Sequence, residues 1–202
     1  MENSFAKQAP WFVYEKEDIK MVKLSELEIG KVLKYEYGPV TREGITKYAF
    51  ASGDRNNIHI NDDFAVQMRL KGVIAHGLYS FSMVARCLED ITGEDGQIVK
   101  FGGQMRGMVR PGDTYIITLT VTAINGDLVD FEFIEQSKTP IKIVKDGEVL
   151  KKFEAEEREW ITEKDITKDL IKTEEVAEGT FYFRLRTAIP GSATIRMVNN
   201  GQ

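Results

Sequence analysis

One stretch, residues 77–92, limits what this chain can fold into. Its apolar side chains recur at helical spacing and cover most of the helix circumference: Leu78, Phe81, Val84, Ala85, Cys87, Leu88 and Ile91. A helix that is apolar on most sides is a buried helix. The rest of the chain must therefore supply a surface that encloses residues 77–92.

After Gly93 the apolar period changes from helical to alternating, which is typical of strands. Residues 31–37 are a first expected strand, and residues 97–109 and 115–123 are the next two. Asn125-Gly126 is a strong hairpin signal before a returning strand with Val129, Phe131 and Phe133 inward. Asp146-Gly147 predicts a second hairpin, and alternation continues to residue 157. A buried helix followed by antiparallel hairpins predicts an α+β fold.

Composition excludes several classes of function. The chain has 202 residues, enough for one well-filled core, with 42% hydrophobic and 29% charged residues. A net charge of −5 gives no support to a nucleic-acid or membrane surface. The single cysteine, Cys87, excludes an intrachain disulfide and fits a reducing compartment. The N-terminus has no signal-peptide pattern and the most apolar window, 73–88, is too short and too polar to span a bilayer, so we expect a cytoplasmic protein.

The residues with the most evident chemistry lie in the stretch 51–65. Asp54 precedes His59 by five residues, between a predicted helix with Thr41 as its N-cap and a second one beginning near Asn61. A carboxylate and an imidazole on a polar turn can act as an acid/base pair near neutral pH. Taken singly, each has a plainer interpretation: Asp54 as a turn residue after Gly53, and His59 as a structural hydrogen-bonding group.

Two sequence blocks carry a resemblance to a known family. Ala51-Ser-Gly-Asp-x-Asn-x-Ile-His59, followed by Gly72-Val-Ile-Ala-His-Gly77, resembles the signature of the MaoC-like (R)-specific enoyl-CoA hydratases. Two blocks in the right order are more specific than either alone. The resemblance covers roughly residues 24–157 and implies a hot-dog fold, in which an antiparallel sheet wraps around a long helix.

The resemblance also implies an enzyme and its residues. The implied reaction is reversible hydration of a trans-2-enoyl-CoA to the (R)-3-hydroxyacyl-CoA, with Asp54 and His59 as the catalytic pair; which of them is acid and which is base stays open. Gly77 is the implied oxyanion-hole residue, because an amide at a helix N-terminus is an oriented donor. Asn56 and His76 are expected to orient the loop. Asn57 stands where the family usually has proline, which makes the loop less rigid.

Other assignments are weaker or compete with these. Arg106 and Arg110 are candidates for binding a phosphate of the substrate, although such residues are often only solvated. We expect no metal and no cofactor besides the CoA thioester, because a metal site would need ligands from two histidines that form no i, i+4 pair. Its candidate ligands are Asp54, His59, Asp62, Asp63 and His76. The alternative functions are a hot-dog acyl-CoA thioesterase and a non-catalytic acyl-thioester-binding subunit.

The expected domain organisation has three parts. Residues 1–30 form an N-terminal extension, residues 31–158 the hot-dog domain, and residues 159–202 a C-terminal extension of unknown role. The partners that the resemblance implies are an acyl-CoA or acyl-carrier-protein thioester and further copies of the chain, in a homodimer or higher homo-oligomer, since a hot-dog sheet leaves its face and edge partly open.

Overall fold

The structure, a computed structural model, describes residues 22–93 and 95–197. Within these residues the strands form one antiparallel sheet in the order β1-β3-β4-β7-β2, with β5 paired to β4 and β6 to β7. The strands are β1 (Val32–Tyr37), β2 (Gln97–Gly103), β3 (Thr114–Asn125), β4 (Leu128–Lys145), β5 (Glu148–Lys152), β6 (Ile171–Val176) and β7 (Gly179–Arg196). The helices are α1 (Arg42–Ser52), α2 (Asn57–Ile60), α3 (Asp62–Gln67), α4 (Gly77–Thr92), α5 (Glu154–Glu157) and α6 (Glu163–Thr167), and a short 3-10 helix spans Leu24–Glu26.

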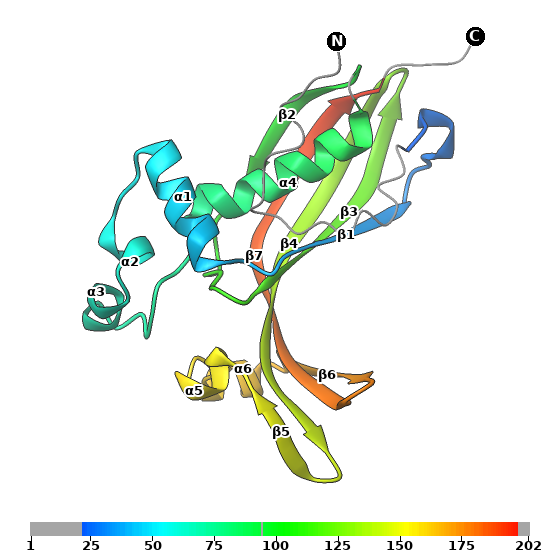
Figure 1. The fold of residues 1–202 in the computed structure, drawn as a ribbon. Coiled ribbons are helices and arrows are strands. Elements are labelled where there is room, and N and C mark those ends of the chain that lie inside the picture. The colour runs from blue at the N-terminus through cyan, green and yellow to red at the C-terminus, as the bar shows by residue number, and fades with distance from the viewer. Residues whose placement is uncertain (1–21, 94, 198–202) are drawn as a thin grey trace, which may run out of the picture.

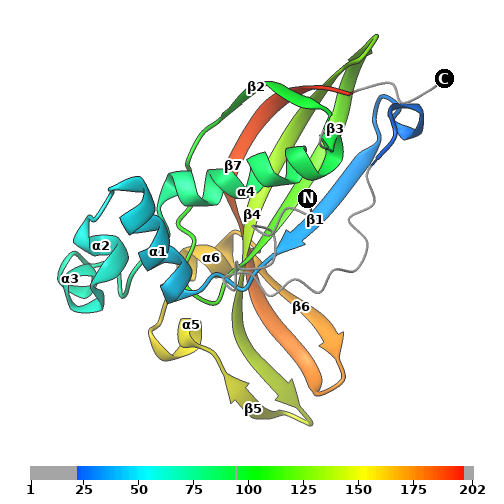
Figure 2. The same ribbon diagram turned by 45° about the horizontal axis from the view of Figure 1, so that its top comes forward.

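Helix α4 lies across one face of the curled sheet, as Figures 1 and 2 both show. Its residues Val84, Cys87 and Leu88 are fully buried, and they belong to one core with inward residues of β3 and β4 such as Leu119 and Phe131. Burying a side chain of this size contributes about 1.5–3 kcal/mol. A curled antiparallel sheet around a long helix confirms the predicted α+β hot-dog fold.

The buried stripe of α4 differs in detail from the predicted one. Leu78 is 61% exposed and Phe81 is only half-buried, whereas Tyr79 and Met83 are buried. The first turn of α4 extends beyond the strands towards α1 (Figure 1), so a side chain there meets no sheet on its outer side. The buried face is therefore rotated away from Leu78.

Strand β7 corrects the predicted domain boundary at residue 158. It pairs with β4 along its whole length, from Leu128↔Arg196 to Val144↔Thr180, and with β2 on its other side. Residues 179–196 therefore supply a strand of the sheet that encloses α4, although 159–202 was expected to be a C-terminal extension of unknown role outside the hot-dog domain. Two smaller differences accompany this: the strand predicted over 97–109 ends at Gly103, and the alternation after residue 152 gives way to α5.

The lower halves of β4 and β7 continue past the helix-covered region and form a second lobe with β5, β6, α5 and α6 (Figure 1). A charged network joins this lobe to the helices beside the main sheet. Asp62 of α3 accepts from Arg158, which follows α5, at 2.8 Å and from Arg42 of α1 at 3.2 Å. Glu154 of α5 pairs with both arginines. The second lobe is thus held against α1 and α3.

Two remaining sequence expectations concern the N-terminus and the membrane. The greater part of the N-terminal extension predicted for residues 1–30 lies outside the described residues. In the part of the chain that the structure describes, no helix has the length and apolar character needed to cross a bilayer.

Candidate active site

Helix α1, which leads into the loop that carries Asp54, is capped at both ends. Helix α1 begins after Thr41, whose hydroxyl accepts from the amide of Gly44 at 2.9 Å, as predicted. It ends at Gly53, which has φ +81°, a left-handed conformation that glycine adopts without steric cost. The chain therefore turns sharply immediately before Asp54.

Asn56 fixes the turn between Asp54 and His59. Its side-chain oxygen accepts from the amide of Ile58 at 3.2 Å and so caps α2. Its own amide donates to Oδ1 of Asp54 at 3.3 Å. One residue thus holds both the Asp54 carboxylate and the start of the helix that carries His59, which is the contact expected of a loop-orienting residue.

The tautomer of His59 follows from its main hydrogen bond. Nδ1 of His59 lies 2.8 Å from the carbonyl oxygen of Ile74. Because a carbonyl only accepts, Nδ1 carries the hydrogen, and in the neutral ring Nε2 holds a free lone pair. The buried imidazole is therefore held with a basic nitrogen available for a proton.

His76 holds the same loop from the other side. Its Nε2–H donates to the backbone carbonyl of Asp54 at 2.9 Å, and its ring stacks on His59 with centroids 3.7 Å apart. Burial lowers the pKa of His76 and the neighbouring His59 lowers it further, which outweighs the hydrogen bond to Asp54. His76 is thus a neutral donor that fixes the backbone of Asp54. Tyr48, a residue with no signal in the sequence, also packs against the His76 ring, with the ring centroids 4.9 Å apart.

The structure brings Asp54, His59 and His76 together. One side-chain nitrogen or oxygen atom of each lies within 4.8 Å of the others. The two histidines are buried, whereas Asp54 is exposed to solvent. A carboxylate at the surface and an imidazole beneath it, spaced to share one water molecule, can hold that water and take its proton.

Gly77 is the first residue of α4, directly after His76. The first amide N–H groups of a helix have no partner within the helix and lie at the positive end of its dipole. A methyl group built on Gly77 would approach Met105 to 3.0 Å, so Met105 packs over this glycine. The N-terminus of α4 thus offers an oriented donor next to the histidine pair.

A metal at this cluster fits the geometry poorly. The rings of His59 and His76 are stacked with an interplanar angle of 26°, so their in-plane lone pairs run side by side and do not converge on one point. Asp62 is engaged by Arg42, Arg158 and the amide of Val73, away from this cluster.

The two arginines proposed for phosphate binding are placed differently. Arg106 is exposed and donates to Gln104. Arg110 is buried, donates to the carbonyl oxygens of Leu70 and Gly72, and lies over the ring of Trp160. The structure therefore does not bring Arg106 and Arg110 into one site.

The family model described as a MaoC like domain matches residues 25–152, more than half of the chain. The chain belongs to the MaoC-like domain family. The matched region includes the Asp54 loop, both histidines and α4. It ends before α5, α6, β6 and β7, so the second lobe lies largely beyond the region that defines a MaoC-like domain.

Curated relatives of this MaoC-like chain have hydratase and dehydratase names. It is 25% identical to a 3-hydroxybutyryl-CoA dehydratase of Methylorubrum extorquens over 138 residues, 67% of this chain and 86% of the relative. It is 29% identical to an (R)-specific enoyl-CoA hydratase of Rhodospirillum rubrum over 110 residues, 54% of this chain and 76% of the relative.

A solved structure matches the fold of this MaoC-like protein. The unliganded R-hydratase PhaJ1 from Pseudomonas aeruginosa superimposes with a TM-score of 0.58 at 17% identity, covering 88% of this chain and 90% of that one. At this identity the likeness concerns the fold alone. The chain is thus a hot-dog protein of the MaoC-like hydratase/dehydratase family.

Proposed function

We propose that the protein is a hydro-lyase that interconverts a trans-2-enoyl-CoA and its (R)-3-hydroxyacyl-CoA. The observation that carries the proposal is the approach of Asp54 and His59 to within 4.8 Å beside the N-terminus of α4. The names of the curated relatives support the reaction class.

In the proposed reaction Asp54 and His59 hold one water molecule. The free Nε2 of His59 and the carboxylate of Asp54 both accept, so the water donates both of its hydrogens and presents an oxygen lone pair to C3 of the substrate. As the C–O bond forms, the water loses one proton to this pair and C2 gains one. We leave open which member of the pair serves as acid and which as base.

Gly77 has the complementary task at the thioester carbonyl. Negative charge develops on that oxygen when water adds, and the amide of Gly77 can donate to it with the dipole of α4 behind it. One such donor is typically worth about 3–4 kcal/mol of barrier. His76 and Asn56 act on the substrate only through the positions of Asp54 and His59.

The proposal is tested with crotonyl-CoA. We expect loss of the enoyl absorbance, no release of free thiol, and a 3-hydroxybutyryl-CoA product of R configuration. Release of free thiol with the enoyl group intact would instead indicate a thioesterase. Tight binding without turnover would indicate a non-catalytic subunit.

A further inference from the structure

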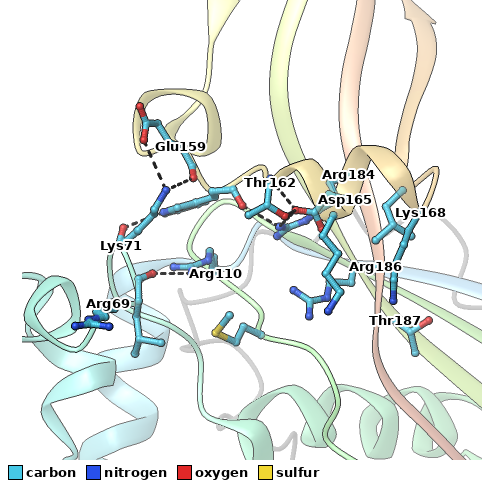
Figure 3. A pocket seen from close by; sticks show the side chains of 15 residues that line it. Arg69, Lys71, Arg110, Glu159, Thr162, Asp165, Lys168, Arg184, Arg186 and Thr187 are labelled. Atoms are coloured by element: carbon cyan, nitrogen blue, oxygen red, sulfur yellow. Dashed lines mark hydrogen bonds and ion pairs between the residues drawn. The ribbon is translucent and has the colours of Figure 1, made fainter.

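A cavity of about 460 Å³ lies between the main sheet and the second lobe. The segment 69–71 after α3 and the segment 108–110 form one side, and residues 159–187 of the second lobe form the other (Figure 3). The cavity is therefore built jointly by the MaoC-like region and by the part of the chain that lies outside it.

The cavity is strongly cationic although the chain as a whole is acidic. Seven lysine or arginine side chains line it, against two carboxylates. Both carboxylates are already engaged: Glu159 pairs with Lys71 at 3.7 Å, and Asp165 pairs with Arg184 at 3.7 Å. The positive charge is therefore left without a matching anion among the residues described.

Two of the cations are rigidly held. Arg184 is 3% exposed and donates to the carbonyl oxygen of Trp160 and to Thr139, while its Nε has no partner in the described chain. Arg110 is 5% exposed, and burial lowers its pKa to about 10 even with Asp113 nearby. Both guanidinium groups line the cavity and are held by backbone or hydroxyl acceptors, so their positive charge is fixed in place for an anion.

Four other cations in the cavity are free to meet a ligand. Within the described residues, the side chains of Arg69, Lys164, Lys168 and Arg186 have no hydrogen-bond or ion-pair partner. Lys164 lies in α6 and Lys168, four residues later, is the residue that follows its last turn, so the two lysines are neighbours on this short helix. Figure 3 shows Lys168 and Arg186 projecting towards the same space.

The cavity and the candidate active site share one segment of chain. Lys71 lines the cavity, and His76 lies five residues later, at most about 18 Å away along an extended chain. The amide of Ala75 also donates to the carbonyl of Val109, which joins this segment to residues 108–110. A ligand that placed its anionic end in the cavity could reach His59 with a flexible arm.

We propose that this cavity binds the phosphate groups of the nucleotide half of coenzyme A, so that the substrate is a CoA thioester and not a carrier-protein thioester. This inference rests on the proposed function. CoA carries a diphosphate and a 3′-phosphate on its adenosine, whereas the phosphopantetheine of a carrier protein carries one phosphodiester. A cavity with several unpaired cations on opposite walls fits the first arrangement.

The test replaces Lys164 and Lys168 together with glutamine. We expect the preference for crotonyl-CoA over crotonyl-pantetheine, which lacks phosphate, to fall at least about tenfold, because charge-assisted contacts to phosphate are lost. Binding of adenosine 3′,5′-bisphosphate, measured by calorimetry without any turnover, is expected to weaken by a similar factor. The matched control is Lys145→Gln/Lys152→Gln, which removes the same charge from the exposed ends of β4 and β5.

The two readouts separate this proposal from the proposed function. If neither thioester is hydrated but the bisphosphate binds and the Lys164/Lys168 variant weakens it, the hydratase proposal fails and the phosphate site stands. The opposite result is that crotonyl-CoA is hydrated, and that the preference for crotonyl-CoA over crotonyl-pantetheine and the affinity for the bisphosphate are the same in the Lys164/Lys168 variant as in the Lys145/Lys152 control. In that case the phosphate site is wrong and the hydratase proposal stands.

Discussion

Two histidines that stack on each other at 3.7 Å are set up for different tasks. His59 donates through Nδ1 to the carbonyl oxygen of Ile74, which leaves the lone pair of Nε2 free. His76 donates through Nε2 to Asp54, and its Nδ1 is buried without a partner among the described residues. Each ring is thus oriented by one backbone carbonyl, and only His59 has its free nitrogen available beside the exposed carboxylate in the arrangement we propose.

Glu135 places a carboxyl group inside the hydrophobic core. Glu135 of β4 is fully buried, and neither of its oxygens has a partner in the described chain. It continues the inward alternation of Phe131 and Phe133, opposite Ile117 of β3 and Ile189 of β7. Burial raises its pKa to about 9, so the folded protein holds it protonated at neutral pH.

Glu135 makes stability depend on pH. Its pKa is higher in the folded than in the unfolded chain, so its contribution is fully present below about 4.5 and is lost as the pH rises through about 9. One such group changes stability by about 1.4 kcal/mol per pH unit within that window. We expect Glu135→Gln to melt higher than the natural chain at pH 9, with little difference at pH 4.5.

The measurement is a series of melting temperatures between pH 4.5 and pH 9. Burial also raises the pKa of Asp113, to about 6, so this group too makes the protein less stable as the pH rises, but only in the acidic part of the range. Glu132→Gln, an exposed position on the same strand, is the control and should keep the natural pH dependence. An unchanged slope in Glu135→Gln would show that Glu135 is not the buried acid described.

At the scale of elements, β7 is the strand that completes the sheet. It fills the position between β4 and β2, and its Ala193 and Ile195 are buried in the core with α4. Gly191 allows β2 to approach, because a side chain there would meet the carbonyl oxygen of Gly102 at 2.2 Å. The hot-dog core therefore depends on residues far beyond the MaoC-like region.

This dependence predicts the effect of shortening or perturbing β7. A chain that ends at residue 158 is expected to show no cooperative unfolding by circular dichroism, because β2 loses the strand with which it pairs and β4 loses its partner on one side. Ile195→Ala, at a fully buried site, should destabilise by about 2–5 kcal/mol. Ile166→Ala, at a site 65% exposed on α6, should change stability by less than about 0.5 kcal/mol. A cooperatively folded 1–158 chain would contradict this topology.

The sequence was sufficient for elements whose signals are local. The apolar pattern of residues 77–92 predicted α4 with its observed bounds, and Asn125-Gly126 and Asp146-Gly147 predicted the two hairpins. The sequence predicted a strand over residues 180–185 but not the full length of β7 or its place in the sheet. Pro190 and Gly191 interrupt the alternation, and proline in a central strand argues against one. Pairing with β4 and β2 is a long-range property that no local pattern contains.

The candidate site was predictable for a different reason. Asp54, His59, Asn56, His76 and Gly77 came from two matching blocks, and the structure places them in one region with the hydrogen bonds expected of the orienting residues. The cationic cavity had no such signal. Its lysines and arginines come from segments separated by about a hundred residues, and only the fold brings them together.

At the scale of the whole molecule, strands β1 and β2 are the two ends of the main sheet. An unpaired edge is a template for another strand, and Val99 on β2 is 48% exposed. The homodimer stays a prediction: we expect light scattering to give twice the chain mass of 22.9 kDa. Val99→Asp on β2 and Val32→Asp on β1 place a charge at an exposed position on each edge, and the substitution that shifts the mass towards one chain identifies the edge that pairs. A natural protein with the mass of a single chain would contradict the predicted homodimer.

The account as a whole depends on Asp54 and His59 acting on a substrate held beside α4. The most direct measurement is the turnover of crotonyl-CoA by Asp54→Asn and His59→Gln, alongside calorimetric binding of CoA to each variant. We predict that each substitution lowers kcat by about 10² or more, as loss of acid/base participation should, while CoA binding stays within a few-fold of the natural protein. Turnover that survives both substitutions in a protein that still binds CoA would contradict the proposed mechanism.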